Sequence, residues 1–208
     1  RRPSAELDLQ EVLLDREQLP SVVNSHSLFG NSRPLAIEIG TGKGLFLTTA
    51  AESNPCCNYI GIEIVAKYAR LAASKLARRS IGNAMVFSAD AGPIFTDRIE
   101  PGTLDAVHVY FPDPWWKKRH RKRRVLNETS LRDICRALRV GGRFHFWTDV
   151  LDYFEDTIEL AASVAPDLGV PLPESASDAS HELDYRTHFE RRSRQHSIPV
   201  YRVHYVKR

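Results

Sequence analysis

The segment PLAIEIGTGKGLF, residues 34–46, decides the fold of this 208-residue chain. Its first half is a short apolar run that ends in glycine, and the length and isoleucine content of the run indicate a buried strand. Residues 44–53 have the pattern of a helix, so Gly40, Gly42 and Gly44 occupy a strand-to-helix turn. Glycine permits tight turns there and lets a ligand approach the backbone. The segment therefore predicts the first unit of an α/β domain, with a ligand site at the turn.

The same alternation of strand and helix continues along the chain. Asn127 is the expected N-cap of one later helix and Gly141 its expected end. Residues 166–180 are rich in Pro, Ser and Asp and indicate a surface connection, after which residues 200–207 suit a late strand that could run antiparallel. This order predicts a mostly parallel sheet with helices on both faces. The other predicted strands are 58–64, 83–90, 103–111 and 142–149, and the other predicted helices are 65–80, 127–140 and 150–165.

Composition and charge narrow the class of protein. Hydrophobic residues make up 42% and charged residues 26%, as in soluble globular proteins, and 208 residues is the size of one domain. We place the domain at residues 34–208, which leaves residues 1–33 as an N-terminal extension of unclear role, in which residues 5–14 could form a helical turn or two. The net charge is +3, yet residues 117–124 alone carry +7, which leaves −4 elsewhere and predicts a local anionic partner.

The sequence offers no sign of a membrane segment, a signal peptide or a metal site. The adjacent Cys56 and Cys57 and the distant Cys135 argue against a disulfide framework, and so we expect a cytoplasmic protein. We interpret His108 and His145, which lie inside predicted strands, as core histidines with a hydrogen-bond partner. Nothing in the sequence indicates an obligate protein partner.

Carboxylates follow three successive predicted strands. Glu38 lies beside the glycine turn, whose spacing departs from the dinucleotide pattern G-x-G-x-x-G. A carboxylate here repels a pyrophosphate but suits a cationic ligand such as S-adenosylmethionine (SAM), which carries a sulfonium and an ammonium group. Glu63 ends the second strand, where an acid binds ribose hydroxyls in open α/β sheets, and Asp90 ends the third, in reach of an adenine amino group. Each acid alone could be a solvated loop residue, but the three together favour a SAM site.

The motif YFPDPWW, residues 110–116, ends the fourth predicted strand and so lies at the same edge of the sheet. Prolines on both sides of Asp113 limit its backbone freedom, which suits a carboxylate that must be preorganised. Trp115 and Trp116 could stack on a base or cover the site, although either could instead pack in the core. The motif therefore predicts that a base is presented to a methyl donor at this edge.

The basic run KKRHRKRR, residues 117–124, follows directly. Its charge density suits the phosphates of a polynucleotide, and we expect Arg121, Lys122 and Arg123 to contact them. A solvated helix face or a localisation signal would give a similar run. Together with the motif before it, the run favours a polynucleotide whose backbone is bound next to the base that reacts.

Several motifs in this order carry a family resemblance. EIGTGKG, GIE, YFPDPWWKKRHRKRR, FHFWTD and YRTHFERR make the chain closely similar to the bacterial tRNA (guanine-N7)-methyltransferases, the TrmB family, from about Pro34 to its end. The resemblance implies a class I SAM-dependent methyltransferase fold, a Rossmann-like and mostly parallel seven-stranded sheet with helices on both faces. It also implies methylation of the variable-loop guanine at the conventional tRNA position 46.

The resemblance assigns roles to individual residues. It implies that Glu38, Glu63, Asp90 and Asp113 belong to the SAM site and that Asp113 is also the catalytic candidate. The chain departs from the family at Trp116, where many members have His, and at His188, where Lys is common and gives a permanent positive charge. It also lacks the glycines expected after Glu190, so substrate affinity and local loop shape are open. The residues that the resemblance places at the substrate are Lys117, Asp149, Thr187, His188, Phe189 and Glu190.

Two other classes of function stay open. The PDPWW motif loosely resembles the (D/N)-P-P-(Y/W) loop of amino methyltransferases that act on adenine N6 or cytosine N4, although Asp113 separates its two prolines. The chain could also be an RNA-binding module that keeps the fold without catalysis, but the intact acidic residues argue against this. No Ser-His-Asp or Cys-His arrangement suggests nucleophilic catalysis.

Overall fold

In the computed structural model, which describes residues 8–175, 190, 193, 196 and 198–208, the chain forms an eight-stranded sheet. The strands from β1 to β6 run parallel to their neighbours, β8 runs antiparallel to β6, and β7 antiparallel to β8. This arrangement confirms the predicted mostly parallel sheet. The order across the sheet is β1 (Leu13–Asp15), β4 (Ala84–Ser88), β3 (Asn58–Glu63), β2 (Leu35–Ile39), β5 (Leu104–Tyr110), β6 (Leu138–Thr148), β8 (Tyr201–Val206) and β7 (Leu172–Pro173).

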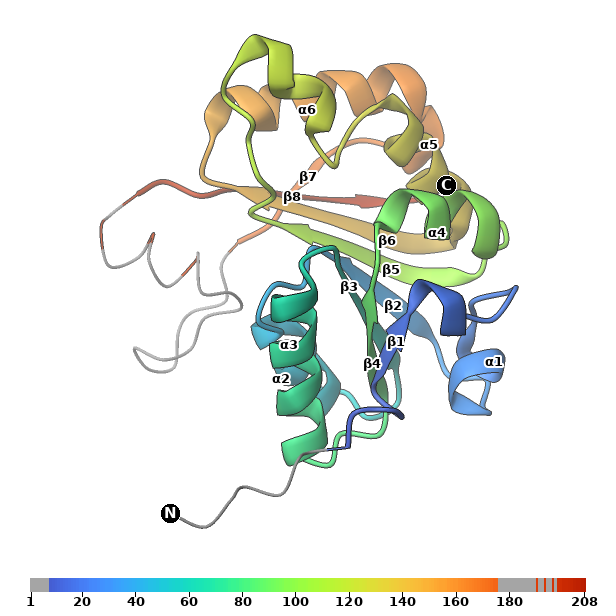
Figure 1. Cartoon of the computed structure of the whole chain (residues 1–208). Coiled ribbons are helices and arrows are strands. Elements are labelled where there is room, and N and C mark those ends of the chain that lie inside the picture. The colour runs from blue at the N-terminus through green and yellow to red at the C-terminus, as the bar shows by residue number, and fades with distance from the viewer. Residues whose placement is uncertain (1–7, 176–189, 191–192, 194–195, 197) are drawn as a thin grey trace.

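Helices cover the sheet on both faces. Figure 1 shows α2 and α3 on one side and α4, α5 and α6 on the other, with α1 beside the amino ends of the strands. None of the helices within the described residues is long and apolar enough to cross a membrane. The helices are α1 (Ser25–Phe29), α2 (Leu45–Ser53), α3 (Ala66–Arg78), α4 (Ala91–Arg98), α5 (Glu128–Ala137) and α6 (Leu151–Val164), with the short 3₁₀ helices η1 (Arg16–Gln18), η2 (Lys118–Arg123) and η3 (Pro166–Leu168).

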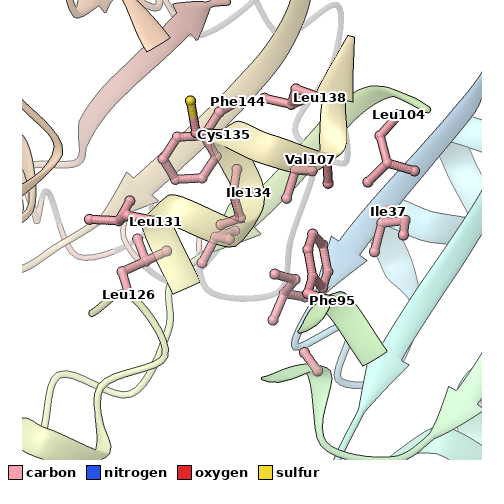
Figure 2. Close-up of a cluster of buried hydrophobic side chains, with 14 of the residues drawn as sticks. Ile37, Phe95, Leu104, Val107, Leu126, Leu131, Ile134, Cys135, Leu138 and Phe144 are labelled. Carbon is pink, nitrogen blue, oxygen red and sulfur yellow. The ribbon is translucent and has the colours of Figure 1, made fainter. Parts of the chain in front are cut away.

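The core lies in two layers, one on each face of the sheet. On one face, Figure 2 shows Ile37, Val107 and Phe144 from β2, β5 and β6 packed with Phe95 of α4 and Ile134 of α5. On the other face, small residues of α2 and α3, with many alanines, pack on β2, β3 and β4. Burial on both faces explains why the central strands read as continuous apolar runs.

The sequence located most elements, but it did not predict α1 or α4 and it misplaced one helix end. Asn127 caps α5 as expected: its side chain accepts from Ser130 N at 3.1 Å, and the Ser130 hydroxyl accepts from Asn127 N at 2.8 Å. The helix nevertheless ends at Ala137 rather than at Gly141, because Leu138 turns into β6 and pairs with Leu104. Gly141 instead sits with a φ of +78° at the irregular start of β6.

The strand count is a second correction, since the sheet has eight strands rather than the seven expected. Strands β1 and β7 were not among the predicted strands, and β1 pairs with β4 at one edge, where the sequence suggested a helical turn. At the other end, the described part of the predicted surface connection contains the exposed two-residue strand β7.

Residues before 34 pack on the rest of the sheet. Leu19 and Val23 are buried in the core layer that contains α4, and the Arg98 guanidinium donates to the carbonyls of Leu19 and Pro20 at 2.7 and 2.8 Å. The division of the chain at residue 34 stays a prediction, but the described part of the extension contributes a strand and core side chains.

Candidate active site

The turn between β2 and α2, residues 40–44, is named here the glycine loop. Gly42 and Gly44 have φ angles of +54° and +70°, which side chains other than glycine rarely adopt. A Cβ at Gly44 would lie 2.7 Å from the Cβ of Ala72, so only glycine lets α2 begin this close to α3. A Cβ at Gly40 or Gly42, in contrast, would meet nothing within 4 Å. The outer face of the loop is therefore open to a ligand.

Two carboxylates lie against the glycine loop. Glu38 of β2 is buried and accepts a hydrogen bond from the Thr41 hydroxyl. Burial raises its pKa to about 7, and the nearby Glu63 carboxylate adds to the rise. A positively charged ligand next to Glu38 would favour its ionised form and relieve this penalty. Thr41 was not identified from the sequence, where it is one polar residue between two glycines.

Glu63, the last residue of β3, is fixed by the backbone on both sides. Its carboxylate accepts from Gly42 N at 2.8 Å and from Val65 N at 2.9 Å. A carboxylate has about four acceptor positions, so two stay available for the hydroxyls of a ribose. Ile64 follows with 70% of its surface exposed and offers an apolar face at the same corner. Ile64 was not singled out from the sequence, where it ended the predicted strand 58–64, whereas β3 ends at Glu63.

Asp90 follows β4 and begins α4. It is exposed, and its side chain accepts from Gly92 N at 3.0 Å, as an N-cap does. Ala89 N donates to the Glu63 carbonyl at 3.1 Å, so Asp90 and Glu63 leave neighbouring strands at the same edge. A hollow of about 510 Å³ lies beside Asp90, between α4 and residues 16–21. Asp90 thus combines a capping role with a position that a ligand could reach.

The segment after β5, residues 111–116, is named here the proline loop. Phe111 and Trp115 bracket it with φ angles of +49° and +47°, which are outliers for bulky side chains. Strain of this kind costs on the order of 1–3 kcal/mol per residue and persists only where the surroundings impose it. Phe111 N donates to the Trp147 carbonyl at 2.8 Å, and Asp113 is exposed between the two prolines.

Arg124 connects the proline loop to α6. Although it belongs to the basic run, it is buried, and its Nε donates to the Pro114 carbonyl at 2.9 Å. Its Nη1 donates to Asp156 at 2.7 Å, and its guanidinium carbon lies 4.3 Å from the centre of the Tyr153 ring. Burial raises the pKa of Tyr153 to about 12. Arg124 therefore does not face a polynucleotide, contrary to the interpretation of the run as uniformly phosphate-binding.

The rest of the basic run forms η2. Lys117 and Lys122 are exposed, whereas Arg121 pairs with Asp156 at 3.1 Å. Arg123 is also exposed and lies 5.1 Å from the centre of the Trp115 ring, in cation–π range. Within the run, Arg121, Arg123 and Arg124 each have a distinct side-chain partner, whereas Lys117 and Lys122 face solvent.

The exposure of the two tryptophans and the contacts of the two strand histidines can be compared with the predictions from the sequence. Trp116 is 70% exposed and does not pack in the core, and Trp115 is half-buried. His108 Nδ1 lies 2.9 Å from the Tyr110 hydroxyl, and His145 Nδ1 lies 3.0 Å from Glu174. Both histidines therefore have the expected hydrogen-bond partners.

The remaining predicted substrate residues are only partly described. Asp149 is exposed directly after β6, at the edge that carries the proline loop. Glu190 is buried, and its carboxylate lies 3.4 Å from Arg202, whose guanidinium lies over the Trp147 ring. Thr187, His188 and Phe189 lie outside the described residues, so their roles and that of Glu190 stay predictions.

Comparisons with known proteins agree on one class. The family model described as "Putative methyltransferase" matches residues 32–203. The chain is 59% identical to a tRNA (guanine-N(7)-)-methyltransferase of Rhodopirellula baltica, over 100% of this chain and 79% of that protein. It is 35% identical to a protein of the same name from Geobacter metallireducens, over 93% and 92% of the two chains.

Solved structures show the fold. The 16S rRNA methyltransferase KamB has a TM-score of 0.62 at 17% identity, over 88% of this chain and 92% of that chain. The aminoglycoside resistance methyltransferase NpmB1 has a TM-score of 0.57 at 20% identity, over 86% and 90%. Both likenesses support the class I methyltransferase fold that the sequence predicted.

Proposed function

Because the chain belongs to the tRNA (guanine-N7)-methyltransferase family, we propose that it transfers a methyl group from SAM to N7 of the guanine at position 46 of tRNA. The observation that carries the proposal is the 59% identity, along the whole chain, to a protein of that name. Two geometric features support it: an open glycine loop lined by two carboxylates, and a carboxylate between prolines at the same edge of the sheet.

The glycine loop fits SAM. The cofactor supplies a methyl group activated by a sulfonium charge. Glu38 would favour that charge from its buried position, and Glu63 would accept hydrogen bonds from ribose hydroxyls with its two remaining acceptor positions. Ile64 offers its exposed apolar side chain to the adenine ring. Asp90 would accept from the adenine amino group.

Asp113 acts on the base. N7 of neutral guanine has a lone pair, so no residue has to remove a proton from the attacking atom. The guanine ring gains positive charge during the transfer, and a fixed carboxylate near it stabilises that charge. Asp113 can also accept from the guanine N1–H or amino group and so orient the ring. The strained proline loop, tied to α6 by Arg124, keeps this carboxylate in place.

Exposed cations next to the proline loop would bind the tRNA backbone. Lys117 and Lys122 are exposed in the run that follows the proline loop, and Arg123 and Trp115 form a pair that could contact a neighbouring nucleotide. A role on tRNA also supports the cytoplasm as the place of action.

A cleavage experiment tests the proposal. The purified chain is incubated with SAM and bulk tRNA, the product is treated with aniline under conditions that cleave at 7-methylguanine, and the break is mapped. We expect one break, at position 46, and none in a transcript in which adenine replaces that guanine. N6-methyladenine or N4-methylcytosine in the product would instead indicate an amino methyltransferase. Binding of tRNA without any methylation would indicate a catalytically inactive module.

A further inference from the structure

One exposed surface outside the predicted site is both apolar and basic. It is formed by Val65, Lys67, Tyr68, Arg70 and Leu71, just before and within the first turns of α3, and is named here the α3 surface. Three of the ten large apolar side chains that are exposed in the described part of the chain lie in the seven positions 65–71. A cluster of this density is unusual for a surface that faces only water.

The charge on α3 has one sign. The helix carries Lys67, Arg70, Lys75 and Arg78 and no Asp or Glu, whereas α6 carries four acidic residues and no Lys or Arg. Solvated helices usually mix the two signs in neighbouring turns. The basic sign of α3 suits an anionic partner, whereas the acidic sign of α6 does not.

Lys43 of the glycine loop adds a positive charge next to the basic side chains of α3. Lys43 Nζ lies 6.0 Å from the centre of the Tyr68 ring, and Lys75 Nζ donates to the Lys43 carbonyl at 2.6 Å. Burial lowers the pKa of Lys75, and the neighbouring Arg79 and Lys43 lower it further. Cations that repel one another reduce the stability of the free protein, and a bound polyanion would offset that loss.

The topology sets the α3 surface opposite the basic run. In the sheet β2 lies between β3 and β5, and the glycine loop, α3 and η2 follow these three parallel strands at the same edge. Strands β3 and β5 are two spacings apart, about 10 Å. A polyanion that lies across the glycine loop would therefore meet η2 on one side and the α3 surface on the other.

We propose that the α3 surface is a second tRNA contact, which binds nucleotides outside the guanine that is methylated. Lys67 and Arg70 contact phosphates, and the half-exposed Tyr68 ring stacks on an unpaired base beside Leu71. This inference rests on the proposed function for the identity of the polyanion. The mixture of an aromatic ring, apolar side chains and cations without acids is the chemistry of a single-stranded nucleic-acid surface.

The test compares two double charge reversals that change the net charge equally. Lys67→Glu/Arg70→Glu alters the α3 surface. Arg33→Glu/Arg143→Glu is the control, because both arginines are exposed at the edge of the sheet opposite the glycine loop. Arg33 precedes β2 there, and Arg143 pairs with Val206, the last residue of the antiparallel strand β8. The dissociation constant for tRNA is measured between 50 and 300 mM salt, and SAM affinity by calorimetry reports on folding of the site.

We expect the α3 reversal to weaken tRNA binding at least about tenfold and to lower the log–log salt slope by about 1.5, since each phosphate contact contributes roughly 0.7–0.9. The control should stay close to wild type. Tyr68→Ala, which leaves the charge unchanged, should weaken tRNA binding about fivefold or more without changing the slope. SAM affinity should stay within about twofold in all variants.

The proposal is overturned if the α3 reversal and its control bind tRNA equally with the same slope. It is also overturned if the wild-type chain self-associates in sedimentation, Tyr68→Ala abolishes that association and tRNA binding is unaffected, since the occupant is then a second copy. Absence of 7-methylguanine formation by the wild-type chain would overturn the proposed function instead, and the binding comparison would still decide the α3 surface.

Discussion

The glycine loop and the proline loop both present carboxylates at the same edge of the sheet, but the protein fixes them by different means. Around the glycine loop the backbone itself does so, because Gly42 and Val65 donate their N–H groups to Glu63 and the loop conformation needs only glycines. The proline loop is strained at two aromatic residues and depends on Arg124, which reaches it from the far end of the basic run. One carboxylate site is fixed by backbone N–H groups, whereas the other depends on the buried side chain of Arg124 and its contacts with α6.

Different perturbations should therefore break the two sites. Substitutions at the glycine loop should affect SAM affinity with little change elsewhere. Substitutions that loosen the proline loop should reduce the rate with smaller effects on binding, because they misplace the carboxylate that acts on the base.

The largest expected effect is at Asp113 itself. Asp113→Asn keeps the shape but removes the charge, and it should lower the single-turnover rate of tRNA methylation by roughly 10²–10³, as loss of one preorganised electrostatic contact does. Affinity for tRNA should change much less. A wild-type rate in this variant would contradict an electrostatic role. At saturating SAM, a rate in the wild-type chain that falls tenfold per pH unit below neutrality would instead favour proton transfer from guanine N1, once titration of Glu38 and His188 is excluded.

Arg124 should give the next largest effect. Arg124→Ala frees the Pro114 carbonyl and removes the contact with Tyr153, so the rate at saturating tRNA should fall by about 10–100-fold through misplacement of Asp113. Stability should fall by about 1–3 kcal/mol. Arg124→Lys keeps the charge without the planar fork and should recover only part of the rate.

Arg121→Ala is the matched control for Arg124, because Arg121 contacts the same Asp156 from an exposed position. It should affect the salt dependence of tRNA binding more than the rate. Equal rate losses in the two alanine variants would show that Arg124 acts only through the charge of the run.

At the glycine loop, Glu63→Ala should weaken SAM binding at least about tenfold, since hydrogen bonds to a charged group contribute roughly 1.5–3 kcal/mol. Glu52→Ala, an exposed acid on α2 that pairs with Arg79, removes the same charge and should leave SAM affinity unchanged. Calorimetry on both variants makes the comparison. Unchanged affinity in a folded Glu63→Ala variant would remove Glu63 from the cofactor site.

The last effect is on stability and concerns pH and Glu38. Since its pKa is raised from 4.5 to about 7, the folded chain holds a proton that the unfolded chain has lost between these values. Protonated Glu38 therefore contributes fully to the free energy of unfolding below about pH 4.5, and this contribution is lost as the pH rises through about 7. Glu38→Gln cannot ionise, so it should stabilise the protein above neutrality by up to about 3 kcal/mol. Thermal unfolding at pH 6 and pH 8 checks this.

The same carboxylate predicts a pH dependence of SAM binding. A cationic ligand prefers ionised Glu38, so affinity should be constant above about pH 7 and fall by up to tenfold per unit below it. Glu38→Gln should bind more weakly and lose this dependence. A wild-type pH profile identical to that of Glu38→Gln would show that the ligand does not sense this charge.

The difference between the two loops also explains what could be predicted from the sequence. The strand ends, the glycines and Glu38 and Glu63 were recognised because their contacts lie within neighbouring strand–turn–helix units. Arg124 was not distinguished from its neighbours, because a buried arginine and an exposed one are identical in a charge run, and its partners Tyr153 and Asp156 lie about thirty residues away.

The remaining errors have similar causes. Strands β1 and β7 have three and two residues, too few to show a period, and they exist only through pairing with β4 and β8. The end of α5 was misplaced because the glycine that indicated a helix stop belongs to an irregular strand start. Propensity was overridden in each case by pairing within the sheet.

The most direct measurement of the central claim uses tRNA in which 7-deazaguanine replaces the guanine at position 46. This base differs by one atom, since a C–H replaces N7 and removes the lone pair. The account predicts single-turnover methylation of the unmodified tRNA, none of the substituted tRNA, and similar affinity for both. Equal methyl transfer to the two tRNAs would show that the acceptor is another atom and would contradict the account.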